Sequence, residues 1–183
     1  ANIERAIKKG TGELPGVIYE EKVYEGYGPG GVAVMIDTLT DNTNRTTSEV
    51  RHLLTKHHGN LGETGCVSWI FEKKGLIAVN RQDCEEEKLM DIAIDGGAED
   101  ISVEDDVFEI ITLPDNFTKV KEVLDSHQIR IVSSEITMIP KTTVKVEGGQ
   151  AEQVVKLMEA LEELDDIQQV YSNFDIDETD LKE

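Results

Sequence analysis

Three glycines near the start of the chain, Gly26, Gly28 and Gly31, match the G-x-G-x-x-G spacing that cradles a pyrophosphate in dinucleotide-binding proteins. That motif requires a helix that opens at the third glycine, so that its free N–H groups meet the phosphates. Here Gly31 leads into VAVMID, a run typical of a strand, and Pro29 lacks an N–H that such a loop would use. The spacing therefore predicts an exposed turn between two strands, without a cofactor, that a bulky partner could approach closely.

The titratable residues predict neither a metal site nor a catalytic centre. His52, His57 and His58 fall in one predicted helix without an H-E-x-x-H pattern, and the two cysteines have no ligand spacing. His57 falls on the apolar face of that helix and is interpreted as a packed histidine. No G-x-S-x-G is present, and acidic pairs such as Asp165-Asp166 are interpreted as a solvated face. We therefore expect no metal, no catalytic residue and no enzymatic activity.

Polar and basic residues of the first half could instead form a contact surface for nucleic acid or the ribosome, because Arg and Asn suit phosphates and base edges. The predicted surface joins the glycine turn to the start of the first long helix. Its candidate residues are Tyr27, Gly28, Pro29, Gly30, Asn42, Asn44, Arg45, Arg51, Lys56 and Asn60. The alternative is an ordinary solvated helix face with ion pairs.

The charge of the chain restricts where such a partner can bind. Residues 1–82 contain 10 Lys/Arg and 10 Asp/Glu, whereas residues 83–183 contain 8 and 28, for a formal net charge of −20. Phosphate binding depends on clustered cations, so the second half should repel nucleic acid. We expect any contact with DNA, ribosomal RNA or messenger RNA to come from the first half or from outside this chain.

No apolar stretch of about 18 residues that could span a membrane is present. The opening ANIERAIKKG lacks the apolar segment of a secretory signal, so we expect a cytoplasmic protein with reduced cysteines. Residues 1–10 have a helical apolar pattern that ends at a glycine but lack an N-cap. They are interpreted as the end of the last helix of a missing N-terminal helical domain; the alternative is a processed, fraying terminus.

Periodicity predicts the elements that would position these residues. Residues 17–26 and 31–40 read as strands, and a helix follows with Thr46 and Glu49 as a capping box and Gly59 as its stop. Residues 66–72, CVSWIFE, read as a third strand. Residues 142–147 and 167–176 read as strands that flank a helix at 150–164.

Residues 75–139 give the order β-α-β-β-α-β of ferredoxin-like folds, with Asp83 and Glu86 capping the first helix. The segment 142–176 cannot cover a sheet alone, so we predict that it pairs with the first strands. The predicted fold class is α+β, with two ferredoxin-like α/β sandwich domains. One is discontinuous, 11–74 with 141–183, and the other, 75–140, is inserted in it.

Four segments, NIERAIKKGTGE, YEGYGPGGVAVMIDTLTDNTNRTTSEVRH, GNLGETGCVSWIFEKKG and DDIQQVYSNFDI, closely resemble the YebC family. The resemblance covers essentially the whole chain. It implies an N-terminal helical domain and two α/β domains, the last inserted, with the helical one largely missing here. This sequence departs from the family at His58, where a glycine is usual, and at Cys66, where a serine is common.

The resemblance also implies a function. Family members are described as cytoplasmic DNA-binding regulators, and others act in translation at ribosomes that stall on proline-rich sequence; no enzymatic activity is implied. The chain is therefore expected to be a non-catalytic regulator of gene expression. The alternative is a ligand-sensing or dimerisation module built on the βαββαβ unit.

Overall fold

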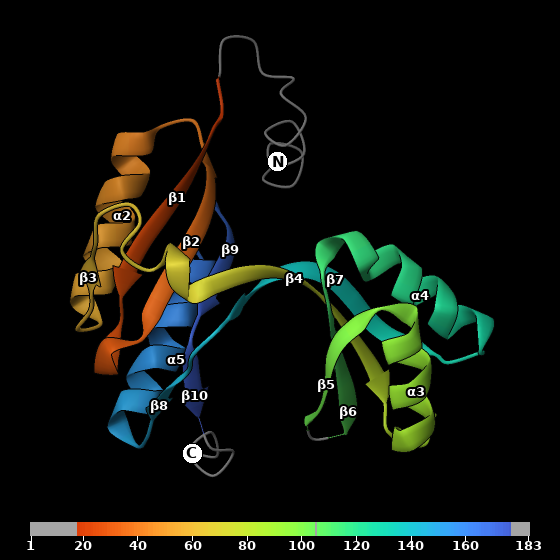
Figure 1. Cartoon of the computed structure of the whole chain (residues 1–183). Helices are drawn as coiled ribbons and strands as arrows, with labels where there is room; N and C mark the ends of the chain where they lie inside the picture. The colour runs from red at the N-terminus through yellow and green to blue at the C-terminus, as the bar shows by residue number, and fades with distance from the viewer. Residues whose placement is uncertain (1–17, 105, 177–183) are drawn as a thin grey trace, which may run out of the picture. The chain divides into compact units, whose positions relative to one another are not determined.

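The structure is a computed structural model that describes residues 18–104 and 106–176 (Figure 1). The predicted helix end at 1–10 and the linker at 10–16 lie outside these residues. Contacts divide the chain into two compact units. We call Phe71–Ile139 the inserted unit, and Ala1–Ile70 together with Pro140–Glu183 the discontinuous unit.

The inserted unit has the element order β-α-β-β-α-β. Its elements are β4 (Phe71–Asn80), α3 (Glu86–Gly96), β5 (Ala98–Glu104), β6 (Val107–Thr112), α4 (Phe117–Ser126) and β7 (Ile131–Pro140). The strands lie in the order β5-β6-β4-β7, and β6 is antiparallel to both of its neighbours. Helices α3 and α4 lie side by side (Figure 1). This is the strand order of ferredoxin-like folds, so the predicted fold class is confirmed.

The core of the inserted unit follows from the spacing of the apolar residues along its strands and helices. Alternate residues of β4, Ile77 and Val79, are fully buried, because successive strand residues point to opposite faces of the sheet. Leu89 and Ala93, four residues apart in α3, cover them from the helix layer. Gly97 ends α3 with a left-handed φ of 107°.

The discontinuous unit has a four-stranded sheet in the order β3-β1-β2-β9, a separate two-stranded sheet and two long helices. Its elements are β1 (Glu20–Tyr27), β2 (Ala33–Thr40), α2 (Thr43–Lys56), β3 (Asn60–Leu61), β8 (Val144–Val146), α5 (Gly149–Glu162), β9 (Ile167–Ser172) and β10 (Phe174–Ile176). The long strands β1 and β2 are antiparallel and pair in continuous register.

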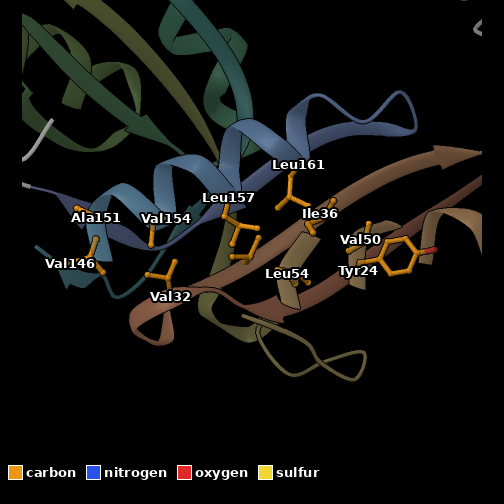
Figure 2. Close-up of a cluster of buried hydrophobic side chains, with 11 residues drawn as sticks. Tyr24, Val32, Ile36, Val50, Leu54, Val146, Ala151, Val154, Leu157 and Leu161 are labelled. Atoms are coloured by element: carbon orange, nitrogen blue, oxygen red, sulfur yellow. The ribbon is translucent and has the colours of Figure 1, made fainter. Parts of the chain in front are cut away.

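One apolar core joins the two sequence segments of this unit (Figure 2). Helix α5 places Val154, Leu157 and Leu161 against the sheet, at the helical spacing of three and four residues. They meet Ile36 of β2 and Leu54 of α2, and all five side chains are fully buried. Burial of a side chain of this size contributes about 1.5–3 kcal/mol. Residues 142–176 are thereby anchored to residues 20–61.

Asn173 divides the predicted strand at 167–176 into β9 and β10. Its buried side chain accepts from the Ala33 N–H at 2.7 Å and donates to the Thr142 carbonyl at 3.0 Å. β9 remains paired with β2, whereas β10 leaves that sheet and pairs in parallel with β8. The strand predicted at 142–147 therefore pairs inside the discontinuous unit.

Two predicted caps are wrong. The N-cap of α2 is Asn42, whose side chain accepts from the Arg45 N–H at 3.1 Å, so Thr46 and Glu49 form no capping box. The Thr46 hydroxyl is buried instead, in hydrogen bonds within the unit. Helix α3 begins after Glu85, so Asp83 does not cap it.

The strand predicted at 66–72 is also wrong. Residues Ser68–Ile70 form a 3-10 turn, β4 begins at Phe71, and the third strand of the sheet is the short β3. The cause is Glu25, whose buried carboxylate accepts from the N–H groups of Gly65, Val67 and Ser68 at 2.7–2.8 Å. Because these amides are bound to a carboxylate, they are not available to a strand ladder.

Candidate nucleic-acid interface

The glycine turn joins β1 to β2, as predicted, but only part of it is exposed. Gly28 and Pro29 are buried, whereas Gly30 is exposed. A Cβ atom on Gly28 would lie 3.1 Å from Leu157 of α5, and one on Gly30 would lie 3.1 Å from Val146 of β8. The expectation of an exposed turn is therefore corrected, because α5 and β8 pack against it.

Three N–H groups of this turn are used inside it. Gly28 donates to the Val32 carbonyl at 2.7 Å, Gly31 donates to the Gly28 carbonyl, and Val32 donates to the Pro29 carbonyl. Pro29 has no N–H to offer. A pyrophosphate cradle needs such groups to point outward, so the turn lacks the geometry of a dinucleotide-binding loop.

The turn lies beside the end of α2 and not beside its start. A Cβ atom on Gly59 would clash with the Tyr27 carbonyl oxygen and lie 3.1 Å from the Gly28 Cα. Helix α2 has 14 residues, and at about 1.5 Å per residue it separates its two ends by about 20 Å. The expectation that the turn neighbours the Arg45–Arg51 segment is wrong, because α2 runs antiparallel to β2.

The candidate residues therefore fall into separate groups. Asn60 is paired with Tyr27 in the sheet, close to the end of α2 where Lys56 lies. Asn42, Asn44 and Arg45 lie at the start of α2. Arg51 lies between the groups, on the exposed side of the helix.

Arg45 belongs to a network of hydrogen bonds around a buried carboxylate, Asp166. Its Nη2 atom contacts Asp41 at 2.9 Å and Asp166 at 2.5 Å. Hydrogen bonds to Asp166 and then to Asp41 raise the pKa of Arg45. The hydroxyls of Thr46 and Thr40 lie 2.9 and 3.1 Å from the same Asp166 oxygen. The guanidinium is thus already bound to two carboxylates, and its first role is to hold α2 against the β9 side of the unit.

The electrostatics of Asp166 follow from this network. Burial acts to raise the pKa of Asp166, but the hydrogen bonds from Arg45, Thr46 and Thr40 outweigh it and lower the pKa below the ordinary value. The interpretation of Asp165-Asp166 as a solvated pair is therefore half wrong, because Asp165 is exposed and Asp166 is buried. No local signal distinguishes them.

His58 has a left-handed backbone conformation, with φ of 62°, just after α2. A non-glycine residue in this region costs about 1–2 kcal/mol, partly offset because glycine loses more conformational freedom on folding. We expect His58→Gly to stabilise the protein by about 0.5–1 kcal/mol. Urea unfolding followed by circular dichroism would measure it.

The matched control is His127→Gly, the same change at the end of α4, where φ is −91°. This change has no strain to relieve, and it also removes the contact of His127 Nδ1 with the Val123 carbonyl at 2.9 Å, so it should lower stability. If His58→Gly is neutral or destabilising as well, the left-handed strain at His58 carries no cost.

The exposed side of α2 is polar and cationic. Asn44, Ser48, Arg51 and Thr55 are exposed and spaced three or four residues apart, which places them along one side of the helix. Lys56 is exposed at its end. Among residues 18–104 and 106–176, neither Arg51 nor Lys56 has an ion-pair partner, which leaves both cations available to a ligand.

Half-buried His57, which packs near the end of α2, has a pKa lowered by burial and then by the charges of Lys56 and His58.

In the part of the chain that the structure describes, no group of three or more His, Cys, Asp or Glu side chains is placed to hold a metal ion. None of the described helices is long and apolar enough to cross a membrane.

Comparisons with known proteins agree with one another. The family model for the TACO1/YebC second and third domain matches residues 19–174. A "Probable transcriptional regulatory protein" of Natranaerobius thermophilus is 55% identical over 181 residues, which cover 97% of this chain and 72% of the relative. A similarly described protein of Geobacter sulfurreducens is 56% identical over 175 residues, covering 96% and 70%.

A solved structure has the same fold. The crystal structure of a conserved hypothetical protein from Aquifex aeolicus is 53% identical, with a TM-score of 0.79, and the match covers 100% of this chain and 75% of that one. The family model spans both units described above, from β1 to the start of β10, and the relatives match almost the entire chain. This chain belongs to the TACO1/YebC family.

Proposed function

We propose that this chain is a non-catalytic, cytoplasmic regulator of gene expression that contacts nucleic acid, either DNA or the RNA of a ribosome, through α2. The names of the relatives describe probable transcriptional regulators, which supports a regulatory role. A role at ribosomes that stall on proline-rich sequence is the second form of the same proposal. Of the remaining candidate contacts, exposed Gly30 and Asn60 would lie at the end of the same surface. Gly28 and Pro29 are buried, and Tyr27 is half-buried with its hydroxyl bound to the Cys66 carbonyl, so we leave these three out of the proposed surface.

The exposed side of α2 is the observation that carries the proposal. The chain has a formal net charge of −20, yet this side, formed by Asn44, Ser48, Arg51 and Thr55, has one cation and no carboxylate. The half-buried Glu49 lies on the neighbouring side of the helix, two turns before Lys56. Cations on a helix face attract phosphates, and amide side chains beside them can donate hydrogen bonds to the phosphate oxygens. Arg45 would contribute less to phosphate binding than its exposure suggests, because two carboxylates already bind it.

Charge reversal of this surface tests the proposal. We expect the double variant Arg51→Glu and Lys56→Glu to weaken binding of the intact protein to nucleic acid or ribosomes by about tenfold, and to reduce the salt dependence by about two phosphate contacts. Electrophoretic mobility shift and ribosome co-sedimentation, each at several salt concentrations, would measure both effects.

The matched control is Lys88→Glu with Arg130→Glu, which makes the same change of charge at exposed positions of the inserted unit. If the control weakens binding equally, only total charge matters and α2 is not the contact surface. Intact protein that shows no salt-sensitive binding to either partner would contradict the proposed function as a whole.

A hollow in the inserted unit favours the second candidate function, ligand sensing. It has a volume of about 850 Å³ and is lined by residues that include Arg81, Cys84, Lys88, Phe108 and His127. The hollow is open to solvent and its lining is mostly polar and charged, so it would suit a charged small molecule better than an apolar one. Thermal-shift screening with amino acids and nucleotides would test it, and a ligand that raises the melting temperature should lose its effect in Lys88→Ala.

A further inference from the structure

Trp69 is the only tryptophan of the chain, and 66% of its surface is exposed in the discontinuous unit. It lies in the 3-10 turn Ser68–Ile70. Its indole Nε1 donates to the Cys66 carbonyl at 3.0 Å, so one edge of the ring is held while most of its surface faces outward. Such exposure is unusual for the largest apolar side chain, and it is not explained by packing within the unit.

The segment that carries Trp69 is held rigidly. Val67 and Ile70, on either side of it, are buried, and the Ile70 N–H donates to the Val67 carbonyl at 2.9 Å. The Glu25 carboxylate binds the amides of Val67 and Ser68 at 2.8 and 2.7 Å. Binding of a partner to Trp69 would therefore cost little in ordering this loop, and a rigid aromatic anchor of this kind is typical of binding hot spots.

A second aromatic residue supports the same carbonyl. The Tyr27 hydroxyl donates to the Cys66 carbonyl oxygen at 3.1 Å, so that oxygen accepts from both ring systems. Tyr27 is half-buried and fixed in β1. The Trp69 indole is thus the exposed member of a pair of aromatic side chains that both bind the Cys66 carbonyl.

The charge around this pair decides the class of partner. Glu63 is exposed in the same loop, where its backbone carbonyl accepts from the Cys66 N–H at 3.1 Å. The Glu25 carboxylate lies beneath the loop, buried and bound to three amides. Burial and then the charges of Glu25 and Glu63 raise the pKa of the Cys66 thiol, in agreement with an acidic setting. Lys141 joins the loop through its backbone N–H, 2.8 Å from the Ile70 carbonyl, and adds one cation. A base stacked on Trp69 would bring its phosphates towards the exposed carboxylate of Glu63, which Coulomb repulsion opposes. A lysine or arginine would be attracted both by Glu63 and by the face of the indole.

We propose that Trp69 is the anchor of a docking surface for a basic protein segment, with an arginine or lysine side chain over its indole ring. The discontinuous unit contains 11 Lys/Arg and 21 Asp/Glu, a formal balance of −10 that attracts such a segment, and Trp69 gives it a defined position. This surface lies on the 62–70 loop and is separate from the exposed side of α2. Loss of binding at one surface therefore does not require loss of binding at the other.

Titration of the full chain with a short synthetic peptide of alternating arginine and glycine tests the proposal. Because the chain has one tryptophan, its fluorescence reports this site alone. We expect a saturable change with the arginine peptide, a weaker one with a lysine version, and none with a glutamate version. In fluorescence anisotropy with labelled peptide, Trp69→Ala should weaken binding by about fivefold, whereas Trp69→Phe keeps part of the affinity.

Met90→Ala is the matched control, because it removes another exposed apolar side chain, 43% exposed in α3, and should leave the affinity unchanged. Thermal melting should show that Trp69→Ala is folded. Equal affinity of Trp69→Ala and the unchanged protein would overturn the proposal, since the peptide would then bind the acidic surface elsewhere. It is also overturned if a single-stranded uridine oligonucleotide changes the fluorescence of Trp69 and displaces the peptide.

Discussion

Glu25→Gln should lower the free energy of unfolding by about 3 kcal/mol, the largest effect we expect from a single isosteric change in this protein. Glu25 is 4% exposed, and its carboxylate accepts from the amides of Gly65, Val67 and Ser68 at once. A neutral amide is a weaker acceptor than a carboxylate, and its NH₂ group would face backbone donors.

The effect of Glu25 should depend on pH. Burial acts to raise the pKa of Glu25, but the hydrogen bonds from Gly65, Val67 and Ser68 outweigh it and lower the pKa. A depressed pKa in the folded state stabilises the protein above the unfolded value of about 4.3, and this stabilisation is lost as the pH falls through the folded pKa. The difference between the unchanged protein and Glu25→Gln should therefore be full near neutral pH and shrink in acid.

Urea unfolding at neutral and acidic pH would measure this difference. Glu21→Gln is the matched control, because it makes the same change at an exposed position of β1 and should be nearly neutral. Equal, small losses in both variants would show that the three amides find other partners. Glu25→Gln should also alter the fluorescence of Trp69, because the turn that holds it would loosen.

Asp166→Asn should cost about 2 kcal/mol. Asp166 is 3% exposed, and one of its oxygens accepts from Arg45, Thr40 and Thr46. The asparagine retains one oxygen but loses the charge that attracts the guanidinium. Arg45 keeps Asp41 as a partner and its side chain is 41% exposed, so it can turn towards solvent, which limits the loss.

The sign of the pH dependence is the same as for Glu25. Because the folded pKa of Asp166 is lowered, the stabilisation is present above the unfolded value of about 3.9 and lost as the pH falls through the folded pKa. Thermal unfolding across this range would measure it. The neighbouring, exposed Asp165→Asn is the control and should leave stability almost unchanged. An equal effect of the two substitutions would contradict the network as the cause.

The local patterns of the sequence were sufficient for most of the elements. The alternation in β4 and the helical spacing of Leu89 and Ala93 depend only on which face of an element is apolar, which neighbouring residues determine. The strand pattern after Gly31 is local in the same way, and it indicates a strand where a dinucleotide-binding loop requires a helix. The prediction failed at 66–72, where the residue pattern is that of a strand. There the carboxylate of Glu25, distant in sequence, binds the backbone amides of the segment and holds them in a turn.

Local periodicity and motifs within short segments were enough to predict most element types, the ferredoxin-like order of residues 75–139 and the family. The folded chain was needed to show which carboxylates are buried, which end of α2 meets the glycine turn, and that two carboxylates already bind Arg45. Thr40 and Asp166, for example, are 126 residues apart and meet through one hydrogen bond. Whether an aspartate is a solvated charge or the centre of a network depends on such long-range contacts, since its neighbours in sequence, such as Asp165, have the same chemistry and a different environment.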